Sequence, residues 1–190
     1  MNDELRQMTQ SGDVETRRRA ALALADLPTD EALAHLDRLL GDVNWRVRKA
    51  AVESAITFAP EAIIPVLLEG LYDAENAGRS KTSVEALIKI GPSVLPFLYE
   101  RLVEEDVDVK LALILLMGEI PSRSSIPHLI YFLSHDNKNI VSAAVSSLGR
   151  LKDPSTLPIL VDLLNRSDDW TNFHLIDAFA EIGGPEAVDR

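Results

Sequence analysis

The chain has no cysteine, and it has no long apolar run. The absence of cysteine excludes disulfides and thiolate metal sites, and it is typical of a reducing compartment, so we expect a cytoplasmic protein. No apolar run approaches the roughly 18 residues that a membrane-spanning helix needs, and the longest candidate is Leu111 to Met117. The first thirteen residues are acidic and polar and do not resemble a signal peptide. We therefore expect no association with a membrane.

Aromatic residues are also scarce: they make up 5% of the 190 residues, although 46% of the chain is hydrophobic. Alanine and leucine must therefore form most of the core. Small and large aliphatic side chains that interdigitate are typical of packed helices. The composition favours an all-α fold.

Four prolines stand at constant spacing, each 31 residues after the one before: Pro65, Pro96, Pro127 and Pro158. Self-similarity at a fixed period indicates a helical unit that is used repeatedly. An apolar column has nearly the same period and closes each unit: Leu27, Phe58, Ile90, Ile120, Leu151 and Ile182. Three residues earlier runs a second column: Leu24, Ala55, Leu87, Met117, Leu148 and Phe179. The spacing predicts six units, at about 1–28, 29–59, 60–91, 92–121, 122–152 and 153–183, and the start of a seventh at 184–190.

Each unit is predicted to be an antiparallel pair of helices. In residues 60–91 the first half has apolar residues at helical spacing, and so does the second half, which ends at Gly91 as a helix cap. The turn between the two helices carries an aspartate, which we expect to cap the second helix. These residues are Asp13, Asp42, Asp73, Asp106, Asp136 and Asp168. The predicted fold is one right-handed α-solenoid over residues 1–190.

The segment DVNWRVRKAAVESAITF, residues 42–58, resembles the second helix of a HEAT-like repeat of the phycobilisome-lyase type. Its Asp42, the Val47-Arg48 pair and the Ala50-Ala51 pair match the pattern of that helix. Residues 153–164 resemble the first helix of the same repeat. The resemblance covers essentially the whole chain and implies a HEAT-like solenoid. It implies little about activity, because the family includes scaffolds, adaptors, lyases and a few enzymes.

Two enzyme classes with HEAT-like folds were tested against the residues. Deoxyhypusine hydroxylases bind iron through His-Glu pairs, but none of the four histidines, His35, His128, His135 and His174, is followed by glutamate. HEAT-like DNA glycosylases hold DNA on a basic face, whereas this chain has a net charge of −11. We therefore expect no enzyme, no metal and no cofactor, and we consider nucleic acid an improbable partner.

Basic residues are nevertheless concentrated near the N-terminus, where residues 1–49 hold 8 basic and 9 acidic side chains. Arg18, Arg48 and Lys49 form the candidate anion-binding cluster. The alternative is that these cations pair with neighbouring acids on a solvated helix surface. Both interpretations remain open at this point.

The second helix of each unit is expected to line a concave face. At 100° per residue, the side of this helix that lies away from the core changes character along the chain. Units two and three carry Lys-Glu pairs, whereas units four to six present apolar bulk beside small residues. The candidate partner-binding residues are Leu111, Leu115, Gly118, Gly149, Phe173 and Asp177. Such a surface suits an amphipathic helix or an extended peptide. The alternative is that Leu111 and Leu115 belong to the core between units.

The sequence thus predicts a non-enzymatic scaffold or adaptor that binds a protein partner on its concave face. Two alternatives remain: an accessory subunit of a lyase or chromophore-handling enzyme, and a binder of anions or nucleic acid through the N-terminal basic cluster. The sequence leaves the oligomeric state undetermined.

Overall fold

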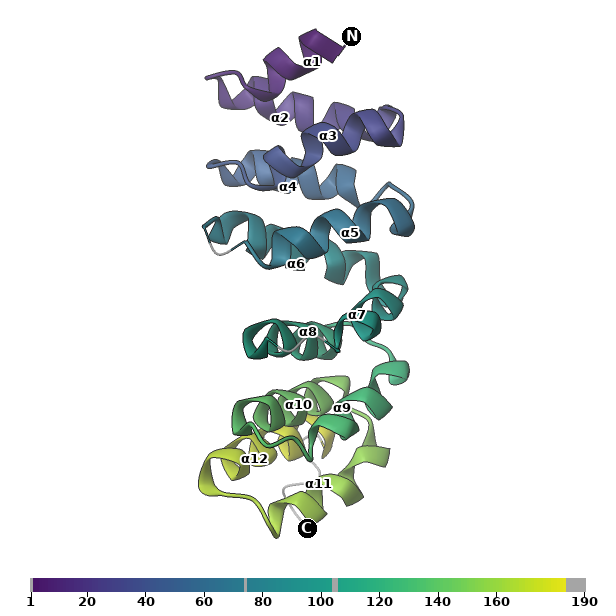
Figure 1. Ribbon diagram of the computed structural model, residues 1–190, viewed down its shortest axis with the longest axis vertical. Helices are drawn as coiled ribbons and strands as arrows, with labels where there is room; N and C mark the ends of the chain where they lie inside the picture. Colours follow the sequence, from purple (N-terminus) through teal and green to yellow (C-terminus); the bar gives the residue numbers. More distant parts are fainter. Residues whose placement is uncertain (1, 74, 104–105, 184–190) are drawn as a thin grey trace. The chain divides into compact units, whose positions relative to one another are not determined.

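The computed structural model describes residues 2–73, 75–103 and 106–183, and these residues form helices and turns without any strand (Figure 1). The predicted all-α repeat fold is confirmed. The start of a seventh unit, at 184–190, lies outside the described residues. The chain divides into two compact units, Met1–Val94 and Leu95–Arg190. We describe each of them by itself.

The first unit contains three helical hairpins. Their helices are α1 (Asn2–Thr9) and α2 (Val14–Ala23), α3 (Thr29–Leu40) and α4 (Trp45–Ala55), and α5 (Pro60–Leu71) and α6 (Ala77–Ile90). The second helices stack side by side in the order α2, α4, α6. The 3-10 turns Leu24–Asp26 and Gly91–Val94 follow α2 and α6. Each hairpin falls within one of the ranges expected from the sequence.

The second unit repeats the arrangement. Its hairpins are α7 (Leu95–Arg101) and α8 (Val107–Glu119), α9 (Ile126–Phe132) and α10 (Lys138–Leu151), and α11 (Leu157–Leu164) and α12 (Asp169–Gly183). The 3-10 turns Arg123–Ser125 and Pro154–Thr156 precede α9 and α11. Helix α10 packs between α8 and α12, as Figure 1 shows. The exposed side of these three second helices is called the α8–α10–α12 face below.

Most residues of the second repeated column lie in the core. Leu24, Leu87 and Leu148 are completely buried, as the periodicity predicts. Two serines, each one residue before a member of the second column, show how closely the helices approach. Ser54 Oγ donates a hydrogen bond to the carbonyl oxygen of Ala21 at 2.6 Å, and Ser147 Oγ donates to that of Ile114 at 2.8 Å. Each bond satisfies a buried hydroxyl with the backbone of the preceding second helix.

Asparagine shares the helix-capping role with aspartate. Asp13, Asp106 and Asp168 accept backbone N–H bonds at the starts of α2, α8 and α12, as expected. The caps of α4, α6 and α10 are asparagines instead: Asn44, Asn76 and Asn137. The expectation for Asp42, Asp73 and Asp136 was therefore wrong, because each of them lies one to three residues before the N-cap position.

Gly91 ends α6 with φ of 79°, which confirms it as a cap that only glycine adopts without strain. The ladder prolines do not all occupy equivalent positions. Pro96, Pro127 and Pro158 are the second residues of α7, α9 and α11, whereas Pro65 lies inside α5, because that helix already begins at Pro60.

Candidate partner-binding surface

The α8–α10–α12 face holds four of the six residues that the sequence analysis singled out for partner binding: Leu111, Leu115, Phe173 and Asp177. Phe173 is 61% exposed and Leu115 is 38% exposed, so neither belongs to the core between successive helical hairpins. Asp177 is exposed and Leu111 is half-buried. The neighbours of Leu115 along α8, including Ile114 and Leu116, are buried. The helical projection therefore placed Leu115 correctly on the exposed side of α8.

The two glycines do not form the open floor that we expected. Gly118 and Gly149 are buried. A Cβ atom on Gly118 would lie 2.7 Å from the Cα of Ser147, and one on Gly149 would lie 2.8 Å from the Cα of Ala178. These glycines let α10 approach α8 and α12 closely. The expectation that Gly118 and Gly149 are exposed is corrected, although Gly149 still reaches the lining of a groove.

That groove lies between α10 and α12 and has a volume of about 530 Å³. Its lining combines the backbone and small side chains of the two helices with charged groups of both signs: Ser146, Gly149, Arg150, Lys152, Asp177, Ala178, Ala180 and Glu181. Lys152 pairs with Glu181 at 2.8 Å, and Arg150 pairs with Glu119 of α8. Ion pairs of this exposed kind contribute little to stability, so the charges are available to orient a partner.

Helix α12 presents more aromatic and apolar surface than the sequence analysis assigned to it. Trp170 is 57% exposed and Ile176 is 63% exposed. His174 lies between Trp170 and Phe173, with edge-to-face ring contacts to both. The hydroxyl of Ser146 also lies 3.2 Å from His174 Nδ1. Ile176 could not be found from the repeat, because its equivalents one and two periods earlier, Val145 and Ile114, are completely buried.

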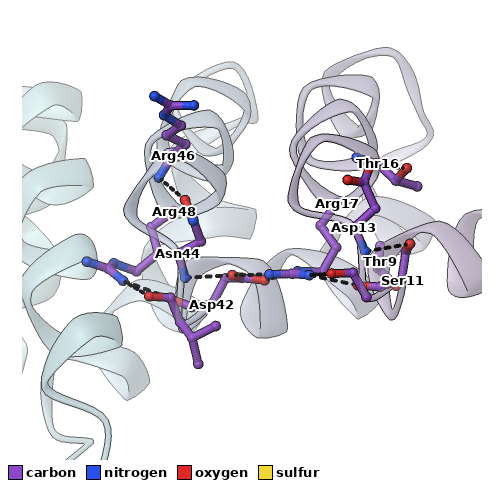
Figure 2. A network of polar contacts seen from close by, with 12 residues as sticks. Thr9, Ser11, Asp13, Thr16, Arg17, Asp42, Asn44, Arg46 and Arg48 are labelled. Carbon is purple, nitrogen blue, oxygen red and sulfur yellow. Dashed lines mark hydrogen bonds and ion pairs between the residues drawn. The ribbon is translucent and has the colours of Figure 1, made fainter.

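In the first unit, the turns between helices are joined by a polar network (Figure 2). Arg17 of α2 donates to both carboxylate oxygens of Asp42, at 2.7 and 3.1 Å, and to the carbonyl oxygen of Ser11 in its own turn. Arg48, one period later, donates to the carbonyl oxygen of Asp42 at 2.8 Å. Arg79 of α6 pairs with Asp73 at 3.0 Å and with Asp37. These contacts bind successive hairpins together at their turns.

This network changes the interpretation of the candidate anion-binding cluster. Arg18 pairs with Glu15 at 2.6 Å, and Arg48 points into the turn, where Figure 2 shows its guanidinium beside Asp42. Lys49 is exposed and lines a shallow depression together with Arg18, Glu15 and Glu53. The three cations do not converge on one site, because Arg48 bonds to the turn carbonyl of Asp42, and the depression that Arg18 and Lys49 share also holds two glutamates.

The same ion pairs predict how stability depends on pH. The hydrogen bond from Lys138 lowers the pKa of Asp168 to about 2. Burial opposes the ionisation of Asp42, yet the hydrogen bonds from Arg17 and Asn44 outweigh it and keep the pKa of this carboxyl below its usual range. Because the pKa of aspartate is lower when folded than when unfolded, these groups stabilise the fold above about pH 4 and lose that contribution as the pH falls toward 2.

Thermal melts between pH 7 and pH 2 check this expectation. The melting temperature should fall steadily below about pH 4, and the Asp168→Asn variant should lose part of that dependence. A melting temperature that stays level or rises down to pH 2 would contradict the assignment of these ion pairs.

The described residues hold no group of three histidine, aspartate or glutamate side chains that could bind a metal ion. Among the same residues, no helix combines the length and the apolar character needed to cross a membrane. The histidines are dispersed: His35 lies in α3, His128 in α9, His135 in a turn and His174 in α12.

The hairpin stack and the matching columns define a helical repeat protein. The family model for HEAT repeats matches residues 2–88 and 95–180, and the chain belongs to this family. The resemblance noted in the sequence is thereby confirmed. No curated protein sequence matches the chain.

Several solved structures are similar to this chain. Importin beta is 17% identical with a TM-score of 0.56, covering 95% of this chain and 30% of its own. Human deoxyhypusine hydroxylase is 14% identical with a TM-score of 0.51, covering 96% of this chain and 84% of its own. The CpcE–CpcF phycocyanin lyase complex from Nostoc sp. PCC7120 is 20% identical with a TM-score of 0.43, covering 99% of this chain and 80% of that chain. At these identities the likeness shows the fold alone, and the fold by itself does not separate a scaffold from an enzyme.

Proposed function

We propose that this HEAT-repeat protein is a scaffold or adaptor that binds a protein partner on its α8–α10–α12 face. The observation that supports the proposal is the exposure of Phe173 and Leu115 on the same side of the helices as the groove between α10 and α12. A large aromatic side chain left in water is unfavourable unless a partner covers it.

The partner that fits this face is an amphipathic helix or an extended peptide. The groove has charged groups of both signs at its rim, including Arg150 and Glu181, and apolar side chains beside it. Binding energy at such a surface concentrates in a few aromatic or aliphatic anchors, while charged groups at the rim set orientation and association rate. Phe173 is the expected anchor, because it is a large aromatic side chain that is 61% exposed, and Asp177 is the expected rim contact.

The observations favour a protein partner over nucleic acid. Arg17 and Arg18 are paired with carboxylates, Arg48 bonds to a turn carbonyl, and the net charge of −11 repels a polyanion. Cytoplasmic location and the absence of catalysis remain parts of this proposal.

The test compares the partner proteins that co-purify from source cells with the wild type and with each of three variants. Phe173→Asp and Leu115→Asp place a charge on the proposed surface, and Val43→Asp is the matched control, because Val43 is 92% exposed but lies in the first unit. All three variants should remain folded by circular dichroism, since none buries the new carboxylate. A partner that is lost with the first two variants, and retained with the control, supports the proposal. Partners that are equally abundant with all four proteins would eliminate this face.

A further inference from the structure

In the first unit, Arg17 pairs with Asp42 in the turn network. The second unit contains an equivalent cation, but no aspartate stands at the position equivalent to Asp42. Arg17 and Lys110 are 93 residues apart, which is three periods of 31. Each is the fourth residue of its helix, and each backbone N–H bonds to the carbonyl oxygen of the aspartate that caps that helix. Lys110 in α8 therefore occupies the position that Arg17 has in α2.

The partner of Arg17 is Asp42, and the residue 93 positions after Asp42 is His135. The two side chains perform one task in common. Asp42 Oδ1 accepts the backbone N–H of Asn44 at 2.8 Å, and His135 Nδ1 accepts the backbone N–H of Asn137 at 3.0 Å. In both turns the residue that donates this N–H caps the following helix. His135 thus performs the first task of Asp42, because it accepts the backbone N–H bond that fixes the turn.

The second task of Asp42, which is to neutralise the cation, has no counterpart. The imidazole of His135 offers no negative charge to Lys110, and Lys110 forms no ion pair with the described residues. Because His135 Nδ1 accepts a hydrogen bond, its ring proton lies on Nε2, which can donate to a ligand. Lys110 and His135 line the same pocket, and the described residues that line it include no aspartate or glutamate.

The remaining walls of this pocket are aromatic and apolar, and its volume of about 670 Å³ is of the size that holds small ligands. The rings of Tyr99 and His128 are stacked 3.8 Å apart, and Tyr99 stands two periods after Asp37, which pairs with Arg79 in the first unit. Tyr131 is 76% exposed and lies against Phe132. An unpaired cation next to a flat aromatic wall suits an anion that is attached to a ring.

We propose that this pocket binds a small aromatic carboxylate. The carboxylate takes the place of the absent aspartate, with hydrogen bonds from the ammonium of Lys110 and from Nε2 of His135, and the ring of the ligand lies against Tyr99 and Tyr131. The site is formed by α7, α8 and α9 and the turn before α10, so it is separate from the residues proposed for partner binding.

The experiment uses 2-naphthoate as the probe and 2-naphthamide as its neutral analogue of the same shape, with affinities measured by calorimetry on the full chain. We expect the wild type to bind the amide at least about tenfold more weakly, because a hydrogen bond between charged groups contributes more than a neutral one. Lys110→Met should weaken naphthoate binding by about tenfold or more, and Lys49→Met, which changes an exposed cation outside the pocket, should leave it unchanged.

Two substitutions at one position provide the sharpest comparison. His135→Asp restores the arrangement of the first unit. The new carboxylate should form an ion pair with Lys110, and it should weaken naphthoate binding about tenfold or more. His135→Asn can accept the same N–H bond from Asn137 without a charge, and it should bind within about threefold of the wild type. Both variants should melt at or above the wild-type temperature, which separates loss of binding from loss of fold.

The proposal would be overturned by equal binding of naphthoate and naphthamide, by wild-type affinity in Lys110→Met, or by equal affinity of the Asp and Asn variants at position 135. Failure of the wild type to bind naphthoate at millimolar concentration would do the same.

Discussion

Replacement of Leu148 by alanine is expected to lower the free energy of unfolding by about 2–5 kcal/mol. Leu148 is completely buried in α10, which packs against α8, α9 and α12. The substitution removes the transfer energy of three carbon groups and leaves a cavity that a helix held on three sides cannot fill by moving. Leu87→Ala in α6 should cause a loss of the same size in the first unit, because Leu87 is buried to the same extent.

Denaturant unfolding followed by circular dichroism measures this loss. Leu115→Ala is the matched control, since it removes the same atoms from a side chain that is 38% exposed, and its loss should be about 1 kcal/mol or less. In a repeat protein the lost stability can appear as a separate early unfolding transition of the compact unit that carries the substitution. Identical unfolding curves for Leu148→Ala and Leu115→Ala would show that the column is not the core.

Replacement of Gly118 by leucine is expected to lower the free energy of unfolding by about 3 kcal/mol. The side chain would have to enter a space in which its Cβ lies 2.7 Å from both the Cα and the Cβ of Ser147. A backbone atom cannot be displaced by a rotamer change, so α8 and α10 must separate, and the bond from Ser147 to Ile114 must lengthen. Leucine has the better helix propensity, so the isolated helix would gain stability and the loss can be attributed to packing.

Gly12→Leu is the control for this prediction. Gly12 lies in an exposed turn, and a Cβ built on it meets no atom within 4 Å. This variant should melt within a few degrees of the wild type, whereas Gly118→Leu should melt far below it. If Gly118→Leu were as stable as the wild type, the close approach of α8 and α10 would be wrong.

The helical projection predicted part of the candidate surface. It placed Phe173 and Leu115 on the exposed side, and the structure confirms that exposure. It misplaced Gly118 and Gly149. Glycine at a repeated helix position occurs both on an open surface and at a close contact between two helices, so the residue type alone does not distinguish the two cases. The distance to the neighbouring helix decides between them.

The pocket of Lys110 and His135 was not found from the sequence, although a signal was present. The cation column contains Arg17, Arg48 and Lys110, and the residue 25 positions after Arg17 is an aspartate, whereas the one 25 positions after Lys110 is a histidine. The aspartates were interpreted as caps, so their pairing with cations of another hairpin was overlooked. A turn aspartate can serve either purpose, and only the direction of its side chain shows which.

The sequence by itself determined the class of fold, the number of hairpins in residues 2–183 and the buried leucine column. These features follow from periodicity, because each helix must bury one apolar side against its neighbours and every unit meets this requirement in the same way. Only the tertiary structure decided which cations are neutralised, which glycines lie between helices, and that Ile176 is exposed where Val145 is buried. These features depend on contacts between residues some 25 to 35 positions apart, and the distances in such contacts are set by the packing of whole helices.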